Sequence, residues 1–178
     1  DDIERILREM ERLLEENKEI SDEIRKELKR LLDENRKLSE DVVKALEDLL
    51  RDLERRKGVE EEVLKRVREV LERIKRELDR SDDELRKVAE RILRDAERSN
   101  DELRKVIEEI EEELRKVRDK DTLRELARKI RKLSEENKER LKELLRELKK
   151  LSDENKERIK KLLKDAEKII EDVRRRAK

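Results

Sequence analysis

Two adjacent stretches are near-copies: residues 132–149 read KLSEENKERLKELLRELK, and residues 150–167 read KLSDENKERIKKLLKDAE. The first copy places apolar side chains at Leu141, Leu144, Leu145 and Leu148. This spacing of three and four residues gathers them on one face of an α-helix. Eighteen residues equal five turns at about 3.6 residues per turn, so the apolar stripe does not drift around the helix. We therefore expect a long, nearly straight amphipathic helix.

The same helical periodicity extends over the rest of the chain and has two interruptions. Gly58, the only glycine, follows the basic run Arg55–Lys57, which is typical of a helix C-terminus. The second interruption covers 119–122, where Thr122 and Glu125 form a capping box and Asp121 is the rival cap. We predict helices over about 2–57, 59–118 and 122–177, with turns near Gly58 and at 119–122.

The width of the apolar stripe indicates how these helices pack. It spans roughly 120–140° on each helix, which suits a helix that contacts two neighbours. The remaining face of each helix is charged. The sequence thus predicts an all-α fold with one domain over residues 1–178. It would be an antiparallel up-down-up three-helix bundle, rod-like and nearly untwisted, with helices on the order of 85 Å long.

Composition excludes several classes of protein. Charged residues make up 61 % of the chain, but acidic and basic residues balance, and aromatic residues, cysteine, histidine and proline are absent. Strict periodicity argues against disorder despite the high charge. Zero net charge favours neither nucleic acid nor anionic lipid as a partner. Because no membrane span or targeting signal is visible, we expect a soluble protein of unknown compartment, expressed in the cytoplasm of a host.

Polar residues interrupt the apolar stripe at positions that recur every eighteen residues. With a turn at Gly58 and parallel outer helices, these positions converge at two heights about 27 Å apart. The first predicted polar layer comprises Asn17, Ser21, Ser99, Ser134 and Asn137, and the second comprises Asn35, Ser39, Ser81, Ser152 and Asn155.

We interpret these residues as two buried hydrogen-bonded layers that set register, the axial alignment of the helices. A competing interpretation treats the serines as helix caps, since Ser81 and Ser99 each precede a glutamate by three residues. Caps at these spacings would leave no residues for loops. Catalytic serines are disfavoured, because the chain has no histidine or cysteine and the stripe contains no lysine.

No other motif indicates a reaction, and we expect no enzyme, no cofactor and no metal. Di-metal sites in helical bundles use inward-facing Glu with Glu-x-x-His motifs, and histidine is absent. One glycine cannot build a glycine-rich phosphate loop, and without aromatic residues no base can stack.

Regular helices, a copied eighteen-residue unit, a Leu/Ile/Val core and periodic Asn and Ser layers resemble computationally designed straight helical bundles. This resemblance implies a very stable scaffold without natural activity, in which Asn and Ser form the buried networks. We expect a monomer that requires no partner. The alternative is an interaction module, either a homo-oligomer subunit or a three-helix host for a partner helix.

Overall fold

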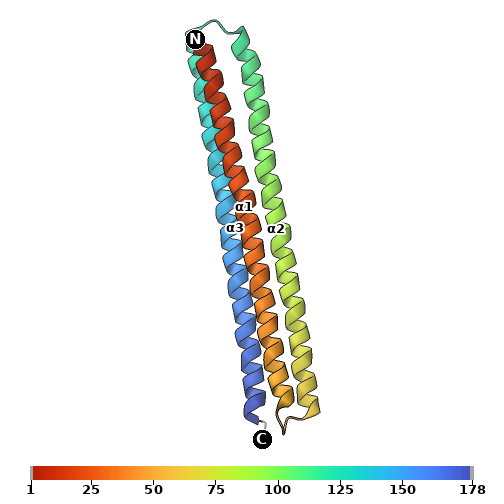
Figure 1. Cartoon of the computed structure of the whole chain (residues 1–178). Coiled ribbons are helices and arrows are strands. Elements are labelled where there is room, and N and C mark those ends of the chain that lie inside the picture. Colours follow the sequence, from red (N-terminus) through yellow and green to blue (C-terminus); the bar gives the residue numbers. More distant parts are fainter. Residues whose placement is uncertain (1, 177–178) are drawn as a thin grey trace. The chain divides into compact units, whose positions relative to one another are not determined.

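A computed structural model describes residues 2–176 of the chain. It contains three long α-helices: α1 at Asp2–Arg55, α2 at Glu61–Lys116 and α3 at Lys120–Arg176 (Figure 1). The helices pack against one another, and the described residues contain no strand. The predicted all-α three-helix bundle is therefore confirmed.

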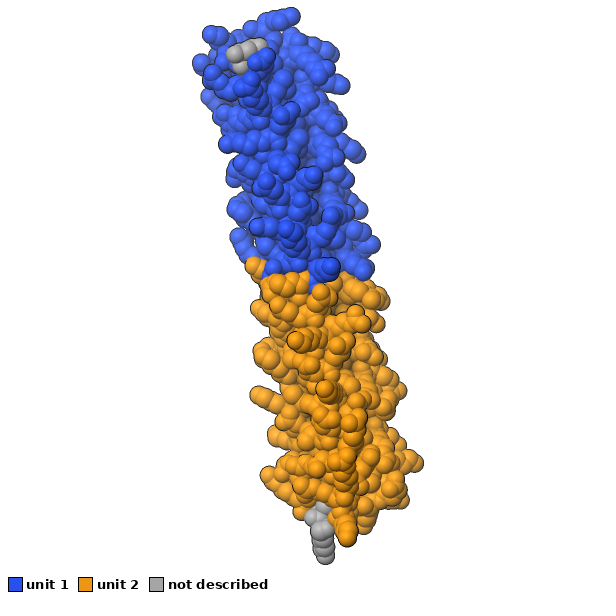
Figure 2. Space-filling view, in the orientation of Figure 1, with its two compact units in different colours: residues 1–29, 89–148 blue, residues 30–88, 149–178 orange. Residues whose placement is uncertain are grey.

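By its internal contacts the chain divides into two compact units, coloured separately in Figure 2. Unit 1 is Asp1–Lys29 with Ala89–Leu148, and unit 2 is Arg30–Val88 with Lys149–Lys178. Each unit therefore contains a segment of every helix.

Ion pairs show the helix directions inside each unit. In unit 1, Glu9 pairs with Arg131 and Glu16 with Lys138, so α1 and α3 run parallel. In unit 2, Glu54 pairs with Arg68 and Glu47 with Lys75, so α2 runs antiparallel to α1. This is the up-down-up order that the apolar stripes predict.

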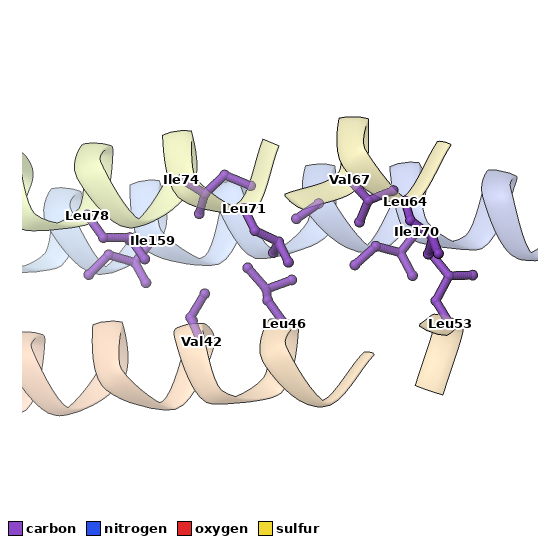
Figure 3. Packing of buried hydrophobic residues seen from close by; sticks show 11 residues of the cluster. Val42, Leu46, Leu53, Leu64, Val67, Leu71, Ile74, Leu78, Ile159 and Ile170 are labelled. Atoms are coloured by element: carbon purple, nitrogen blue, oxygen red, sulfur yellow. The ribbon is translucent and has the colours of Figure 1, made fainter. Parts of the chain in front are cut away.

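Aliphatic side chains form the core of each unit. The core of unit 2 joins residues of all three helices, among them Leu46, Leu78 and Ile159, each at most 1 % exposed (Figure 3). In unit 1, Met10, Ile107 and Ile130 belong to the corresponding cluster. Burying one such side chain contributes about 1.5–3 kcal/mol, so these cores are the main source of stability.

The first turn follows the glycine signal. Gly58 has a φ of 87°, which lies in the left-handed region that glycine adopts without a Cβ clash. Helix α1 ends at Arg55 and α2 begins at Glu61, so the turn is wider than the predicted limits of 57 and 59. The reason is that the Glu60 carbonyl accepts the first helical hydrogen bond of α2, from Leu64 N at 3.1 Å.

The second turn differs from the prediction of 119–122. Helix α2 ends at Lys116 rather than 118, and α3 begins at Lys120 rather than 122. Asp119 caps α3, because its Oδ1 accepts a hydrogen bond from Asp121 N at 3.2 Å. The predicted caps Thr122 and Asp121 instead lie inside the first turn of α3, where the Thr122 hydroxyl donates to Asp119 Oδ2 at 3.2 Å.

The third predicted helix end, residue 177, lies outside the described residues.

Helix α2 runs without interruption through Ser81 and Ser99. The capping interpretation of these serines is therefore wrong.

Candidate functional site

Five side chains of unit 1 occupy the first predicted polar layer. Asn17, Ser21, Ser99, Ser134 and Asn137 are all buried, and Ser134 is completely inaccessible to solvent. Pairs on one helix lie three or four residues apart, as Ser134 and Asn137 do, so the helix turns both toward the bundle interior.

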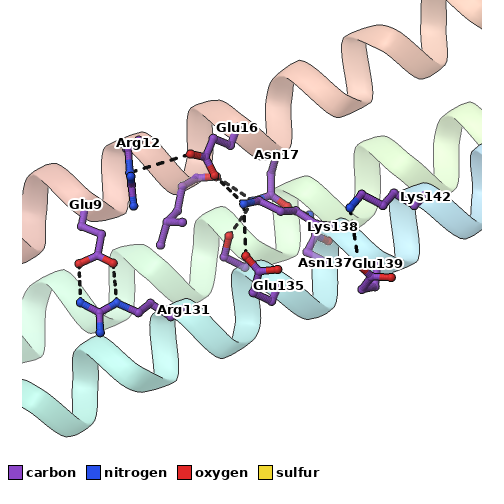
Figure 4. Close-up of polar contacts among 12 residues, drawn as sticks. Glu9, Arg12, Glu16, Asn17, Arg131, Glu135, Asn137, Lys138, Glu139 and Lys142 are labelled. Atoms are coloured by element: carbon purple, nitrogen blue, oxygen red, sulfur yellow. Dashed lines mark hydrogen bonds and ion pairs between the residues drawn. The ribbon is translucent and has the colours of Figure 1, made fainter.

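Asn17 and Asn137 are the centre of this layer, and Figure 4 shows both side chains between their helices. Asn17 Nδ2 donates to Ser134 Oγ at 2.9 Å and to the Leu13 carbonyl of its own helix at 2.7 Å. Asn137 Nδ2 donates to Asn17 Oδ1 at 2.8 Å, and Asn137 Oδ1 accepts from the Ser99 hydroxyl. The hydrogen bonds thus connect α1, α2 and α3.

Asn100 joins the same layer. Its Oδ1 accepts a hydrogen bond from Asn137 Nδ2 at 2.8 Å, and its Nδ2 donates to the Asn17 carbonyl at 3.4 Å. Asn100 is not among the residues predicted from the sequence, because it lies at the edge of the apolar stripe. Its position directly after Ser99, matched by Asp82 after Ser81 in the preceding repeat, is the signal that could have revealed it.

The second layer lies in unit 2 and repeats this pattern. Asn35, Ser39, Ser81, Ser152 and Asn155 are all buried. Asn35 Nδ2 donates to Ser152 Oγ and to the Leu31 carbonyl, both at 2.8 Å. Asn155 Nδ2 donates to Asn35 Oδ1 at 2.8 Å, and Asn155 Oδ1 accepts from the Ser81 hydroxyl.

Each layer contains one predicted serine that the network does not use. Ser21 and Ser39 are buried, but no hydrogen bond of either layer involves them. Ser39 Oγ is inaccessible to solvent and has no partner with hydrogen-bond geometry. The structure therefore brings eight of the ten predicted residues together in closed networks.

Ion pairs between α1 and α3 repeat the alignment of the two layers. Four pairs join residues that lie 122 positions apart in the sequence. They are Glu9 with Arg131, Glu16 with Lys138, Glu34 with Lys156, and Asp52 with Arg174.

These ion pairs change the acidity of the α1 carboxylates. The hydrogen bond from Arg131 holds the pKa of Glu9 below its usual value, and Lys138 does the same for Glu16. Figure 4 shows both contacts. The carboxylates lie on the bundle surface, where such pairs are worth little individually.

The grooves beside the central amides of α3 offer little room for a ligand. Grooves of about 180 Å³ and 130 Å³ lie beside Asn137 and Asn155, respectively. Both are smaller than the roughly 300–1,000 Å³ of a typical ligand pocket. Within residues 2–176, no group of three or more acidic residues is arranged to hold a metal ion.

No family model matches the chain, and no curated protein or solved structure matches it either. Among the described helices, none has a stretch apolar and long enough to cross a membrane.

Proposed function

We propose that this chain is a designed structural scaffold with no catalytic activity, and that its two polar layers set the register and topology of the helices. The observation that carries this proposal is that the nitrogen and the oxygen of four side-chain amides are all hydrogen-bonded. Each of Asn17, Asn35, Asn137 and Asn155 donates two hydrogen bonds through Nδ2 and accepts one through Oδ1.

Because the amides find their partners in one arrangement, the layers favour one axial alignment of the helices over others. Contacts among Leu, Ile and Val are non-directional, so a core of these residues tolerates several alignments. A helix that slips along its axis would place an amide against an aliphatic side chain. Each buried polar group left without a partner costs about 1–3 kcal/mol, so slipped alignments are penalised.

The designed origin is supported by regularity at every level. The eighteen-residue repeat recurs in the core, in the polar layers and in the ion pairs between α1 and α3. The absence of any matching family, curated protein or solved structure is consistent with this origin.

The test replaces both layers and reads out register. A variant carries Leu at Asn17, Asn35, Asn137 and Asn155, and Ala at Ser81, Ser99, Asn100, Ser134 and Ser152. We expect equal or higher stability toward denaturant, because apolar substitutes of similar volume often replace a buried polar group without loss.

Register is then measured by disulfide trapping, which is clean because the chain has no cysteine. Cysteines at Glu9 and Arg131 report the native alignment, and cysteines at Glu9 and Lys138 report a slip of seven residues. We expect the original chain to form only the first cross-link and the layer-free variant to form both. If the layer-free variant also forms only the native cross-link, the layers do not set register.

The burial of apolar side chains argues against the alternative function, an interaction module. Ile169, which is 40 % exposed, is the one large hydrophobic residue exposed within residues 2–176. An interface for a partner helix normally presents a contiguous apolar patch.

A further inference from the structure

The two polar layers differ at one position. Asn100 follows Ser99 on α2 in the first layer, whereas Asp82 follows Ser81 in the second. Both side chains accept a hydrogen bond from the central amide of α3. The distance is 2.8 Å from Asn137 Nδ2 to Asn100 Oδ1, and 3.3 Å from Asn155 Nδ2 to Asp82 Oδ1.

An aspartate and an asparagine have the same shape but different hydrogen-bonding capacity. Asn100 accepts one bond and donates another, to the Asn17 carbonyl at 3.4 Å. An ionised carboxylate can only accept, so Asp82 cannot reproduce the donated bond. A protonated carboxyl group accepts and donates, and it therefore matches an asparagine.

A buried hydroxyl group on α1 lies beside Asp82. Ser39 Oγ on α1 is buried and lacks a partner with hydrogen-bond geometry, although it lies close enough to influence the Asp82 carboxyl group. Both residues line a groove of about 810 Å³ between α1 and α2 in unit 2. This hydroxyl can donate to an ionised Asp82 carboxylate or accept from a protonated carboxyl group.

The charged groups around Asp82 do not neutralise it. On α2, Asp79 and Asp83 add like charge, and Arg86 pairs with Asp83 at 3.3 Å. On α3, Arg158 donates to Ser81 Oγ at 3.3 Å rather than to Asp82.

The α1 side of the groove is also of mixed charge. Asp33 and Lys44 line it, Arg36 pairs with Glu40 at 3.4 Å, and Glu47 pairs with Lys75 of α2 at 2.9 Å. Within the described part of the chain, Asp82 itself forms no ion pair.

We propose that Asp82 makes the second layer a pH-responsive element: a half-buried carboxylate weakens unit 2 at neutral pH, and its protonation strengthens unit 2 while leaving unit 1 unchanged. The response depends on the hydrogen-bonding capacity of one side chain. This pH response goes beyond the proposed function, because it does not depend on whether the layers set register.

The pKa of Asp82 is shifted in the direction that the proposal requires. Burial has the largest effect and raises the pKa of Asp82 above 3.8, the neighbouring Ser39 hydroxyl and the hydrogen bond from Asn155 lower it, and the charges of Asp79 and Asp83 raise it. A raised pKa means that the folded chain holds this proton more tightly than the unfolded chain. The stabilisation is complete below about pH 3.8 and is lost as the pH rises through the folded pKa.

The test compares Asp82→Asn with the unchanged chain by residue-resolved hydrogen exchange at each pH. Because the two chains are compared at the same pH, their intrinsic exchange rates cancel. Carboxylates with lowered pKa values, such as Glu16 and Glu34, destabilise the fold as the pH falls, and their contribution cancels in the same way. At about pH 7 we expect Asp82→Asn to protect the amides of unit 2 more strongly. At about pH 3 the amides of unit 2 should be equally protected in the two chains.

The reverse substitution is the matched control. Asn100→Asp should transfer the pH response to unit 1, and the double variant Asp82→Asn with Asn100→Asp should show it there alone. An NMR titration of the Asp82 carboxyl carbon in the intact chain should give a midpoint above 3.8.

Two results would overturn the proposal. One is equal protection of unit 2 in Asp82→Asn and the unchanged chain at both pH values. The other is an Asp82 carboxyl that titrates at or below 3.8. A Ser39→Ala variant removes a hydroxyl that lowers the pKa of Asp82, so it should move the titration midpoint of the Asp82 carboxyl upward.

Discussion

At the scale of single residues, Asn137 illustrates why a buried amide must have every partner. Its side chain connects α3 to Asn17 on α1 and to Ser99 and Asn100 on α2. Replacing this amide alone with leucine leaves those partners unsatisfied in a buried layer. We therefore expect Asn137→Leu to lower the free energy of unfolding by about 1–3 kcal/mol, measured by chemical denaturation.

The control for Asn137→Leu is Glu136→Leu, one residue away on the exposed surface of α3. It introduces the same side chain without breaking a buried hydrogen bond, so its effect should stay within about 0.5 kcal/mol. If both variants had the same stability, the amide network would contribute nothing beyond the packing of its atoms.

At the scale of elements, the start of α3 separates two competing helix caps. Asp119 accepts the Asp121 backbone N–H, whereas the Thr122 hydroxyl only contacts the Asp119 carboxylate. We expect Asp119→Ala to cost about 0.5–2 kcal/mol of unfolding free energy. Thr122→Ala should cost clearly less, and the reverse order of the two losses would assign the cap to Thr122.

This helix start also shows what the sequence could and could not predict. The apolar stripes and their two interruptions predict the number and order of the helices, and the short turns predict that consecutive helices run antiparallel. At the second turn, Asp119, Asp121 and Thr122 are all good capping residues within four positions. Propensity alone cannot rank them, because the choice depends on where packing of Leu114 and Leu123 stops the adjacent helices.

The polar layers were predictable where burial and repetition coincide. Asn17 and Asn137 interrupt an apolar stripe, so their burial follows from the helical period. Asn100 and Asp82 lie at the stripe edge, where a polar residue normally faces water. The ion pairs between α1 and α3 were not predictable. Because 61 % of the residues in the chain are charged, each long surface side chain has several oppositely charged neighbours.

At the scale of the whole molecule, the chain combines an interior that is apolar except for the two polar layers with a surface of balanced charge. Basic and acidic residues are equal in number, and apolar residues make up only 32 % of the chain. Most of these apolar side chains are buried or lie against the cores of the two units. The straightness of the helices and the organisation as one domain over residues 1–178 stay predictions from the eighteen-residue repeat.

The same distribution predicts the oligomeric state. A stable homo-oligomer usually buries a contiguous apolar surface, and Ile169 is the sole exposed large hydrophobic residue within residues 2–176. We therefore expect light scattering to give the mass of one chain, 21.8 kDa, over concentrations from about 1 μM to about 1 mM.

Ile169→Lys is the control for this measurement, because it removes the exposed apolar side chain without touching either core. If the unchanged chain associates and Ile169→Lys does not, contact through this residue is weak and local, and the closed bundle remains the functional unit. A stable mass above one chain that persists in Ile169→Lys would mean that the charged faces form the interface. The interaction module would then replace the single-chain scaffold as the function of this protein.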